Sequence, residues 1–413
     1  MKKIIFILLI IILSTFTLSG CWDREEPENF AVVIGIGFDY NPDRDMYKIV
    51  MQIASPLIAL GIEGGGAEDK PAFWTVSAWG HTTIDAISNL RKKVTRQIFY
   101  AHTHVFVISE KLLQEKGNMP VIDALERTRL SRPIVLMAVT SDDVTKVLEV
   151  DFPIENYNVK GIMDMIKLTN AEIGSTTAES GKDFINKLST PGLEPVAVNL
   201  ELLNEGNENQ TNEENEEKNN QNTGQLESEL DNPPPIRIEG ITTFSRDQLA
   251  GFLNSRETRG WNWVMGQVER AVINIKLPEI ENKLSLIARE SSSRIEPVIQ
   301  DGEPEINLMI KATGDIQGVM GRGQFEQQSE LTQSLKRKYS EVIRNDIKQA
   351  ITQAQLQKSD IFGFGNSFYR LKYDKWQEVK DDWDDIFSDL KVNINVEVEL
   401  QRTGMINRSV EPQ

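Results

Sequence analysis

The chain of 413 residues contains a single cysteine, Cys21. One cysteine excludes an intramolecular disulfide and any metal site built from several cysteine thiolates. Histidine is almost as scarce, since only His81, His102 and His104 are present. His102 and His104 lie two positions apart on an expected strand and share a face, but no third ligand is spelled out nearby. Partly buried polar side chains are therefore a simpler interpretation of this pair than a metal site.

Recognisable catalytic and nucleotide-binding motifs are also missing. The segment 35–37, Gly-Ile-Gly, lacks the third glycine and the following helix of a dinucleotide-binding loop, and more simply marks a bulge or a close backbone approach in a strand. The sequence has no Gly-x-Ser-x-Gly elbow and no His-Glu-x-x-His helix. The acidic run KDDWDD is typical of the solvated face of an amphipathic helix rather than of a catalytic carboxylate pair. We therefore expect a protein that is not an enzyme and that uses no catalytic cofactor or metal.

Positive charge is in short supply as well. Lys and Arg number 45 against 62 Asp and Glu, so the formal net charge is −17. An acidic surface repels nucleic acid and anionic lipid headgroups, which argues against nucleic-acid binding. Attachment to a membrane would then have to come from a lipid anchor rather than from a basic patch.

The chain begins with its one long apolar run. Two lysines precede the apolar segment 4–16, and small residues and Leu18-Ser19-Gly20-Cys21 follow it. This order is typical of a secretory signal peptide, and the run is shorter than the ~20 residues of a membrane-spanning helix. The last four residues resemble the cleavage box of bacterial lipoproteins, which implies removal of residues 1–20 and attachment of diacylglycerol and an N-acyl chain to Cys21. An uncleaved anchor or a buried structural cysteine is the alternative.

The apolar pattern beyond the signal peptide predicts an α+β protein of about three domains, each with a mainly antiparallel or mixed sheet packed with helices. Residues 21–190 alternate short strands with amphipathic helices and include an expected hairpin over 30–54. Residues 191–275 form a middle module. Residues 276–408 combine a meander of strands, two amphipathic helical segments and a final alternating strand. Residues 191–408 can also be counted as one C-terminal region.

An acidic insert interrupts the middle module over residues 204–235. Between 204 and 231, nine acidic residues accompany a single lysine, Lys218, and apolar residues are nearly absent. Such a composition predicts disorder, and the three prolines at 233–235 stiffen its exit. Strand patterns flank the insert on both sides, which favours an expanded loop between two strands of one module over an interdomain linker.

Several stretches from Cys21 to about Ile406 together resemble one family, the Ger(x)C lipoproteins, which are the C subunits of nutrient germinant receptors in endospore-forming Firmicutes. The matching stretches are LSGCWDREE with VVIGIGFD, AHTHVFVISEKLLQEKG with IDALERTRLSRP, GITTFSRDQLAGFLNSRETRGWNW, and SDIFGFGNSFYRLKYDKWQEVKDDWDDIF with VNINVEVELQRTGMI. The acidic insert, Pro27 and Asn29 depart from the pattern expected of the family.

The resemblance implies a non-enzymatic, lipid-anchored receptor subunit on the outer face of the inner spore membrane. It would lie beside an A subunit and a polytopic B subunit, with Cys21 as the lipid site and an elongated arrangement of three α+β domains. Two other classes stay open. A solute-binding lipoprotein of an importer would need two doubly wound lobes around a cleft, and a surface lipoprotein enzyme would need a catalytic constellation.

A partner surface on so acidic a body is expected to be an apolar or aromatic patch. Candidate contacts are Trp261 and Trp263, together with Phe362 and Phe364, which lie between glycines in the stretch DIFGFG. The two phenylalanines are either a plug in the core or an exposed docking tip. The plug is favoured because buried aromatic side chains are the commoner case.

Overall fold

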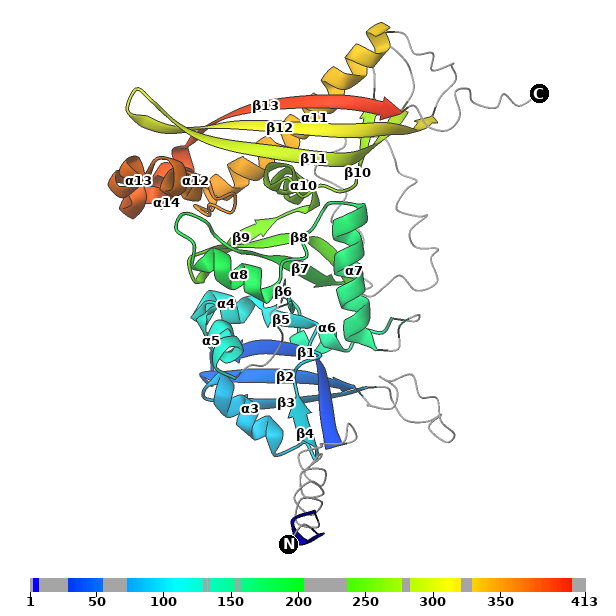
Figure 1. Ribbon diagram of the computed structural model, residues 1–413, viewed down its shortest axis with the longest axis vertical. Helices are drawn as coiled ribbons and strands as arrows, with labels where there is room; N and C mark the ends of the chain where they lie inside the picture. Colours follow the sequence, from blue (N-terminus) through cyan, green and yellow to red (C-terminus); the bar gives the residue numbers. More distant parts are fainter. Residues whose placement is uncertain are drawn as a thin grey trace, which may run out of the picture.

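The chain folds into two β-sheets surrounded by helices. The computed structural model describes residues 3–6, 29–54, 73–128, 132, 134–152, 155, 157–203, 236–276, 283–320 and 329–402. Figure 1 shows an elongated molecule with the first sheet towards one end and the second sheet towards the other. The predictions for Cys21 and for the acidic insert 204–235 lie outside the described residues.

The first sheet contains nine strands in the order β3-β2-β1-β5-β6-β7-β8-β9, with β4 paired to β1. Its centre, β1-β5-β6-β7, is parallel, and antiparallel hairpins extend it at both ends. The predicted hairpin over 30–54 is confirmed as β1 and β2. The strands are β1 (Phe30–Asn41), β2 (Met46–Ala54), β3 (Phe73–Gly80), β4 (Gln97–Phe99), β5 (Val105–Ser109), β6 (Leu136–Thr140), β7 (Val196–Leu202), β8 (Ile236–Ser245) and β9 (Gln248–Leu253).

Helices cover both faces of this sheet. One core includes Leu90, Val121 and Phe184 from helices on one face, and a second core includes Val144 and Val159 from helices on the other face. The central strands are apolar along nearly their whole length because both faces are covered. The helices are α3 (Thr83–Arg91), α4 (Glu110–Lys116), α5 (Met119–Thr128), α6 (Val144–Leu148), α7 (Asn158–Glu172) and α8 (Gly181–Leu188).

Two glycines of β1 let α6 and α7 approach the sheet closely. A Cβ on Gly35 would lie 2.5 Å from Val159 Cγ2, and one on Gly37 would lie 2.2 Å from Val144 Cγ1. The pairing of β1 with β2 also shifts register between Val33 and Gly35. The structure therefore confirms that these glycines mark a bulge and a close packing position.

The second sheet has four strands in the order β10-β11-β12-β13, of which the first three form an antiparallel meander and β13 pairs parallel with β12. Its strands are β10 (Ala271–Lys276), β11 (Lys283–Gln300), β12 (Glu303–Met320) and β13 (Lys391–Arg402). One large core joins this sheet to its helices. The helices are α10 (Ser255–Met265), α11 (Ser329–Leu356), α12 (Phe364–Leu371), α13 (Tyr373–Val379), the 3-10 helix η2 (Lys380–Asp382) and α14 (Trp383–Asp389).

The α+β, multi-domain fold class is confirmed. Of the strands in the predicted middle module, β7, β8 and β9 belong to the first sheet and β10 belongs to the second. Strand β7 pairs with β6, so the predicted boundary at residues 190 and 191 falls between two strands of one continuous sheet. Helix α10 and strand β10 belong instead to the core of the second sheet. The described residues therefore form two bodies: a first body around β1–β9 and a second body around β10–β13. None of their helices is long and apolar enough to cross a membrane.

Candidate functional site at the junction of the two bodies

The segment Asp360–Gly365, with the sequence DIFGFG, leads from the loop after α11 into the first residues of α12. It lies where the second body meets the first body, and this contact region is called the junction. Phe362 and Phe364 are 2% and 0% exposed, and their rings stack with centroids 5.1 Å apart. The interpretation of these two side chains as a core plug agrees with this burial. The structure does not support the docking-tip alternative, because neither phenylalanine ring is exposed at the surface.

Trp261 and Trp263 are also fully buried, and this corrects their selection as partner contacts. Both lie on α10, whose inner face packs against α11 and β11. The Trp261 indole Nε1–H donates a hydrogen bond of 3.0 Å to the Ile361 carbonyl. Trp261 thus holds the segment Asp360–Gly365 in place from within the core.

Asp360 organises the same segment from the centre of the junction. Its Oδ1 accepts a hydrogen bond from Phe364 N–H at 3.0 Å, and its Oδ2 accepts bonds from Gly365 N–H at 2.7 Å and Trp383 Nε1–H at 3.0 Å. The carboxylate therefore satisfies free N–H groups at the start of α12 and fixes α14 beside it. Complete burial raises the pKa of Asp360 to about 6, and these hydrogen bonds oppose that rise.

Close backbone packing joins Gly365 to the first body. A Cβ on Gly365 would lie 2.7 Å from Trp383 Nε1 and 2.8 Å from Gly192 Cα. Asn366 N–H donates to the Gly192 carbonyl at 2.9 Å, and Glu194 N–H donates to the Asp360 carbonyl at 2.9 Å. The second glycine of DIFGFG is therefore needed because two backbones meet there.

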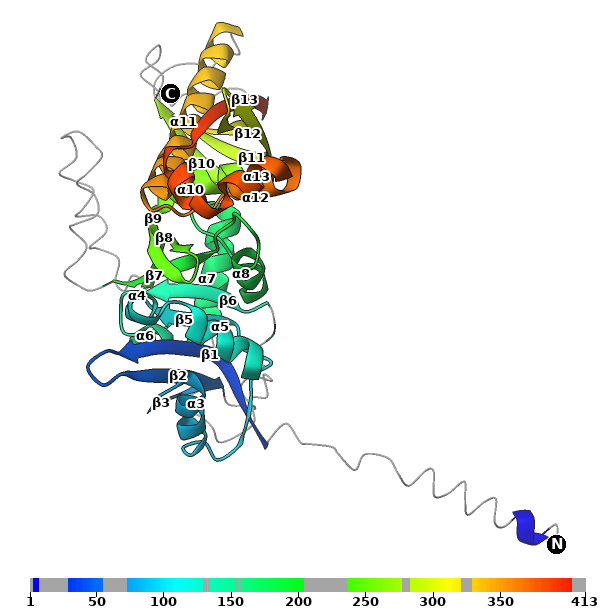
Figure 2. The ribbon, with the colours of Figure 1, turned by 90° about the vertical axis from the view of Figure 1, so that its left-hand side faces the viewer.

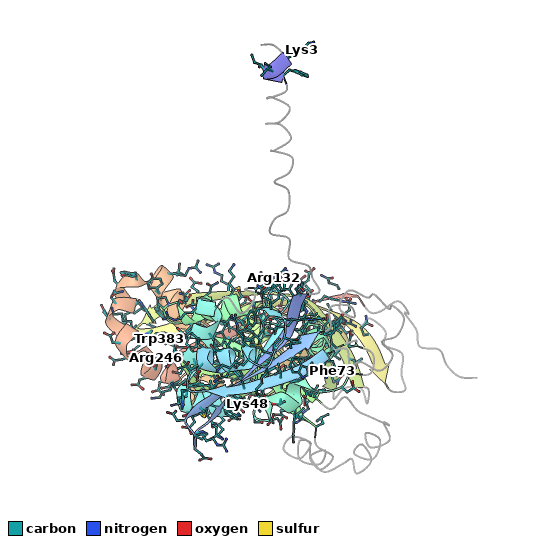
Figure 3. All side chains as sticks on the ribbon, turned by 90° about the horizontal axis from the view of Figure 1, so that it is seen from below. Lys3, Lys48, Phe73, Arg132, Arg246 and Trp383 are labelled. Carbon is teal, nitrogen blue, oxygen red and sulfur yellow. The ribbon has the colours of Figure 1, made fainter. Side chains whose placement is uncertain are left out.

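Charged groups complete this contact at its edge. Arg246, in the turn between β8 and β9, forms an ion pair with Asp384 of α14, at 3.2 Å. Figure 3 places the labelled Arg246 and Trp383 on the same side of the molecule. The Glu194 carboxylate accepts a hydrogen bond from Arg246 N–H at 2.8 Å. Burial raises the pKa of Glu194 to about 7, and the nearby carboxylates of Asp384 and Asp360 add to this rise.

Glu194 makes the stability of the junction depend on pH. Its pKa rises from 4.5 to about 7 on folding, so the folded state binds the proton more tightly. The resulting stabilisation is complete below pH 4.5 and is lost as the pH rises through 7. We expect urea unfolding of Glu194→Gln to show a smaller decrease in unfolding free energy between pH 5 and pH 8 than the wild type, by about 1–3 kcal/mol. Identical pH dependence in both proteins would contradict this role.

A cleft of about 850 Å³ lies beside the junction, between α8 and β11. Its wall includes Lys187 and Glu179, whose Nζ and Oε1 atoms are 2.7 Å apart and which are both largely buried. Burial raises the pKa of Glu179, against the effect of the Lys187 ammonium. Lys187 Nζ also lies 5.3 Å from the centroid of the Trp261 ring, so the pair connects the first body to α10. The contact between Lys187 of the first body and Trp261 of the second body therefore helps to hold the two bodies together.

The histidines take no part in the junction. His81 and His102 are exposed, and His104 is half-buried on the approach to β5, where burial lowers its pKa. In the part of the chain that the structure describes, no three His, Cys, Asp or Glu side chains come close enough to hold a metal ion.

An exposed aromatic cluster that the sequence patterns did not single out lies just beyond the junction. Tyr369, Leu371 and Tyr373 expose 38%, 62% and 55% of their surface at the end of α12 and the start of α13. The available signal is the alternation of large apolar or aromatic residues with basic residues in YRLKY, which spans the end of α12 and the start of α13.

The fold and the junction define a two-body α+β protein whose junction is held by an Asp360-capped helix. Two family models match the chain in order. The model described as spore germination protein N-terminal domain matches residues 23–202, and the model described as spore germination B3/GerAC like, C-terminal, matches residues 239–404. The chain therefore belongs to the GerAC-like family of spore germination proteins, which confirms the resemblance to Ger(x)C proteins.

Individual relatives match along nearly their whole length. The chain is 25% identical to spore germination protein KC of Bacillus subtilis (strain 168) over 411 residues, which cover 98% of this chain and 97% of that protein. It is 23% identical to spore germination protein B3 of the same organism, over 95% of this chain and 96% of that protein. The crystal structure of the GerBC protein matches the fold with a TM-score of 0.51 and 18% identity, covering 89% of this chain and 96% of that one.

Proposed function

We propose that this chain is the lipid-anchored C subunit of a nutrient germinant receptor and that nutrient-triggered spore germination requires it. The observation that carries the proposal is the ordered match of both family models, over residues 23–202 and 239–404, together with relatives named as spore germination proteins that match over nearly their whole length. The role is non-enzymatic: the subunit assembles with the A and B membrane subunits on the outer face of the inner spore membrane.

The anchor in this proposal is Cys21, through its diacylglycerol and N-acyl chains. Two or more acyl chains give stable attachment to a bilayer, whereas one chain gives only marginal attachment. Confinement to the membrane also raises the effective concentration of the chain near membrane-embedded partners. The importer alternative receives no support from the second sheet, which is a meander rather than a doubly wound lobe.

Replacement of the anchoring thiol tests the attachment. We expect Cys21→Ala to move the protein from the membrane fraction to the soluble fraction of disrupted spores, because no acyl chain can then be attached. Immunoblotting of the two fractions measures the distribution, and Ser19→Ala, which keeps a small residue before the cysteine, is the matched control. Full retention of Cys21→Ala in the membrane would contradict a single lipid anchor.

A further inference from the structure

Five consecutive residues at the end of α12 and the start of α13 have exposed side chains, which are aromatic, aliphatic or basic. We call residues Tyr369–Tyr373 the YRLKY patch. Tyr369, Leu371 and Tyr373 expose 38%, 62% and 55% of their surface, and Arg370 and Lys372 between them are also exposed. Single exposed apolar residues are normal on a protein surface, but several together mark sites of interaction.

The aromatic rings of the patch are held in place by the core beneath them. The Tyr369 ring packs against the Tyr373 ring, with centroids 5.8 Å apart, and against the Trp376 ring at 6.5 Å. Trp376 is 5% exposed and packs edge-on against Trp383, which is hydrogen-bonded to Asp360. A partner that binds here finds ordered rings, so binding loses little side-chain entropy.

The charge of the patch is opposite to that of the chain as a whole. Arg370 and Lys372 form no ion pair with another described residue, whereas nearby Lys375 is paired with Glu378 at 3.2 Å. Along the sequence, Asp374 is the one acidic residue within three positions of the patch, in a chain whose net charge is −17. Unpaired cations beside tyrosines suit an acidic partner, because opposite charge steers association and Tyr and Arg are enriched at binding hot spots.

The location of the patch favours a protein partner over a bilayer. Figures 1 and 2 both place α12 and α13 in the second body, well away from β1 in the first body. Phe30 follows Cys21 by nine residues, which span about 30 Å when fully extended. An anchor at Cys21 therefore keeps the start of β1 within about 30 Å of the bilayer surface, whereas it places no such limit on the patch in the second body.

We propose that the YRLKY patch binds an acidic segment of a second subunit of the receptor, which has an apolar recess for the tyrosine rings. Arg370 and Lys372 pair with the carboxylates of that segment, and Tyr369, Leu371 and Tyr373 fill the recess. This inference rests on the proposed function, because that function supplies the neighbouring subunits.

Photo-crosslinking in intact spores tests the partner directly. The probe benzoylphenylalanine replaces Lys372 in the full-length anchored protein, and a second strain carries it at exposed Lys348 of α11 as a control. We expect a crosslink to the A or B subunit from position 372 alone, reduced at least about tenfold when Arg370→Glu is added. A crosslink only to a second copy of this chain, only to lipid, or to nothing would overturn the proposal.

Charge reversal tests whether the contact is needed. We expect Arg370→Glu/Lys372→Glu to slow nutrient-triggered release of dipicolinic acid at least about tenfold, at an unchanged level of the protein in the membrane fraction. Arg344→Glu/Lys348→Glu makes the same charge change on exposed residues of α11 and should stay within about twofold of the wild type. A normal response of the patch variant, in a background where deletion of the gene abolishes the response, would overturn the patch proposal and leave the proposed function intact.

Discussion

Asp360→Ala lowers the free energy of unfolding by about 3 kcal/mol or more, because it leaves three buried N–H donors without an acceptor. The donors belong to Phe364, Gly365 and Trp383, so the start of α12 and the position of α14 are both affected. Urea unfolding of the purified protein at pH 8 measures the loss. Asp360→Asn keeps one carbonyl oxygen and should lose less than Asp360→Ala.

Asp374→Ala is the matched control, because Asp374 is exposed in the first turn of α13. It should change the unfolding free energy by only about 0.5 kcal/mol, as surface substitutions usually do. Equal effects of the two alanine substitutions would show that the hydrogen bonds of Asp360 do not hold the junction.

Trp261→Ala is expected to cost about 3–5 kcal/mol, which is the usual range for removing a fully buried large aromatic side chain. The substitution leaves a cavity in the core of the second body and leaves the Ile361 carbonyl without its hydrogen bond. It also removes the ring beside the Lys187 ammonium. The midpoint and slope of urea unfolding measure the effect.

The control for Trp261 is Trp74, a tryptophan on edge strand β3 that is 48% exposed. Trp74→Ala should cost about 1 kcal/mol or less, because little buried surface is lost. If Trp261→Ala were as mild as Trp74→Ala, the junction would not depend on α10.

Local patterns predicted much of the fold. The alternation of apolar and polar residues in β13 and the turn chemistry between β1 and β2 are short-range signals, and they indicated the correct elements. The sheet that a strand joins is a long-range property. Strands β7 to β9 continue the first sheet through the pairing of Ala138 with Val198, and no periodicity within residues 191–275 encodes that pairing.

The candidate site was less predictable, because burial depends on what covers a side chain. The sequence favoured a plug over a docking tip for Phe362 and Phe364 only on general grounds. In the structure, Trp261 and Trp383, which are distant in sequence, hydrogen-bond to the segment that carries the two rings. Asp360 carried no signal, because an aspartate in a loop is usually exposed and nothing local marks this one as buried. The exposed tyrosines Tyr369 and Tyr373 had a signal in the sequence, because they alternate with basic residues at the end of α12 and the start of α13.

Deletion of the gene in a strain that lacks every other nutrient receptor, with only the genes for this receptor left, tests the central claim most directly. Release of dipicolinic acid from purified spores after addition of nutrient mixtures is the measurement. We expect the deletion to abolish release in response to one set of nutrients and the intact gene to restore it. Normal release from the deletion strain would contradict the assignment of this chain to a germinant receptor.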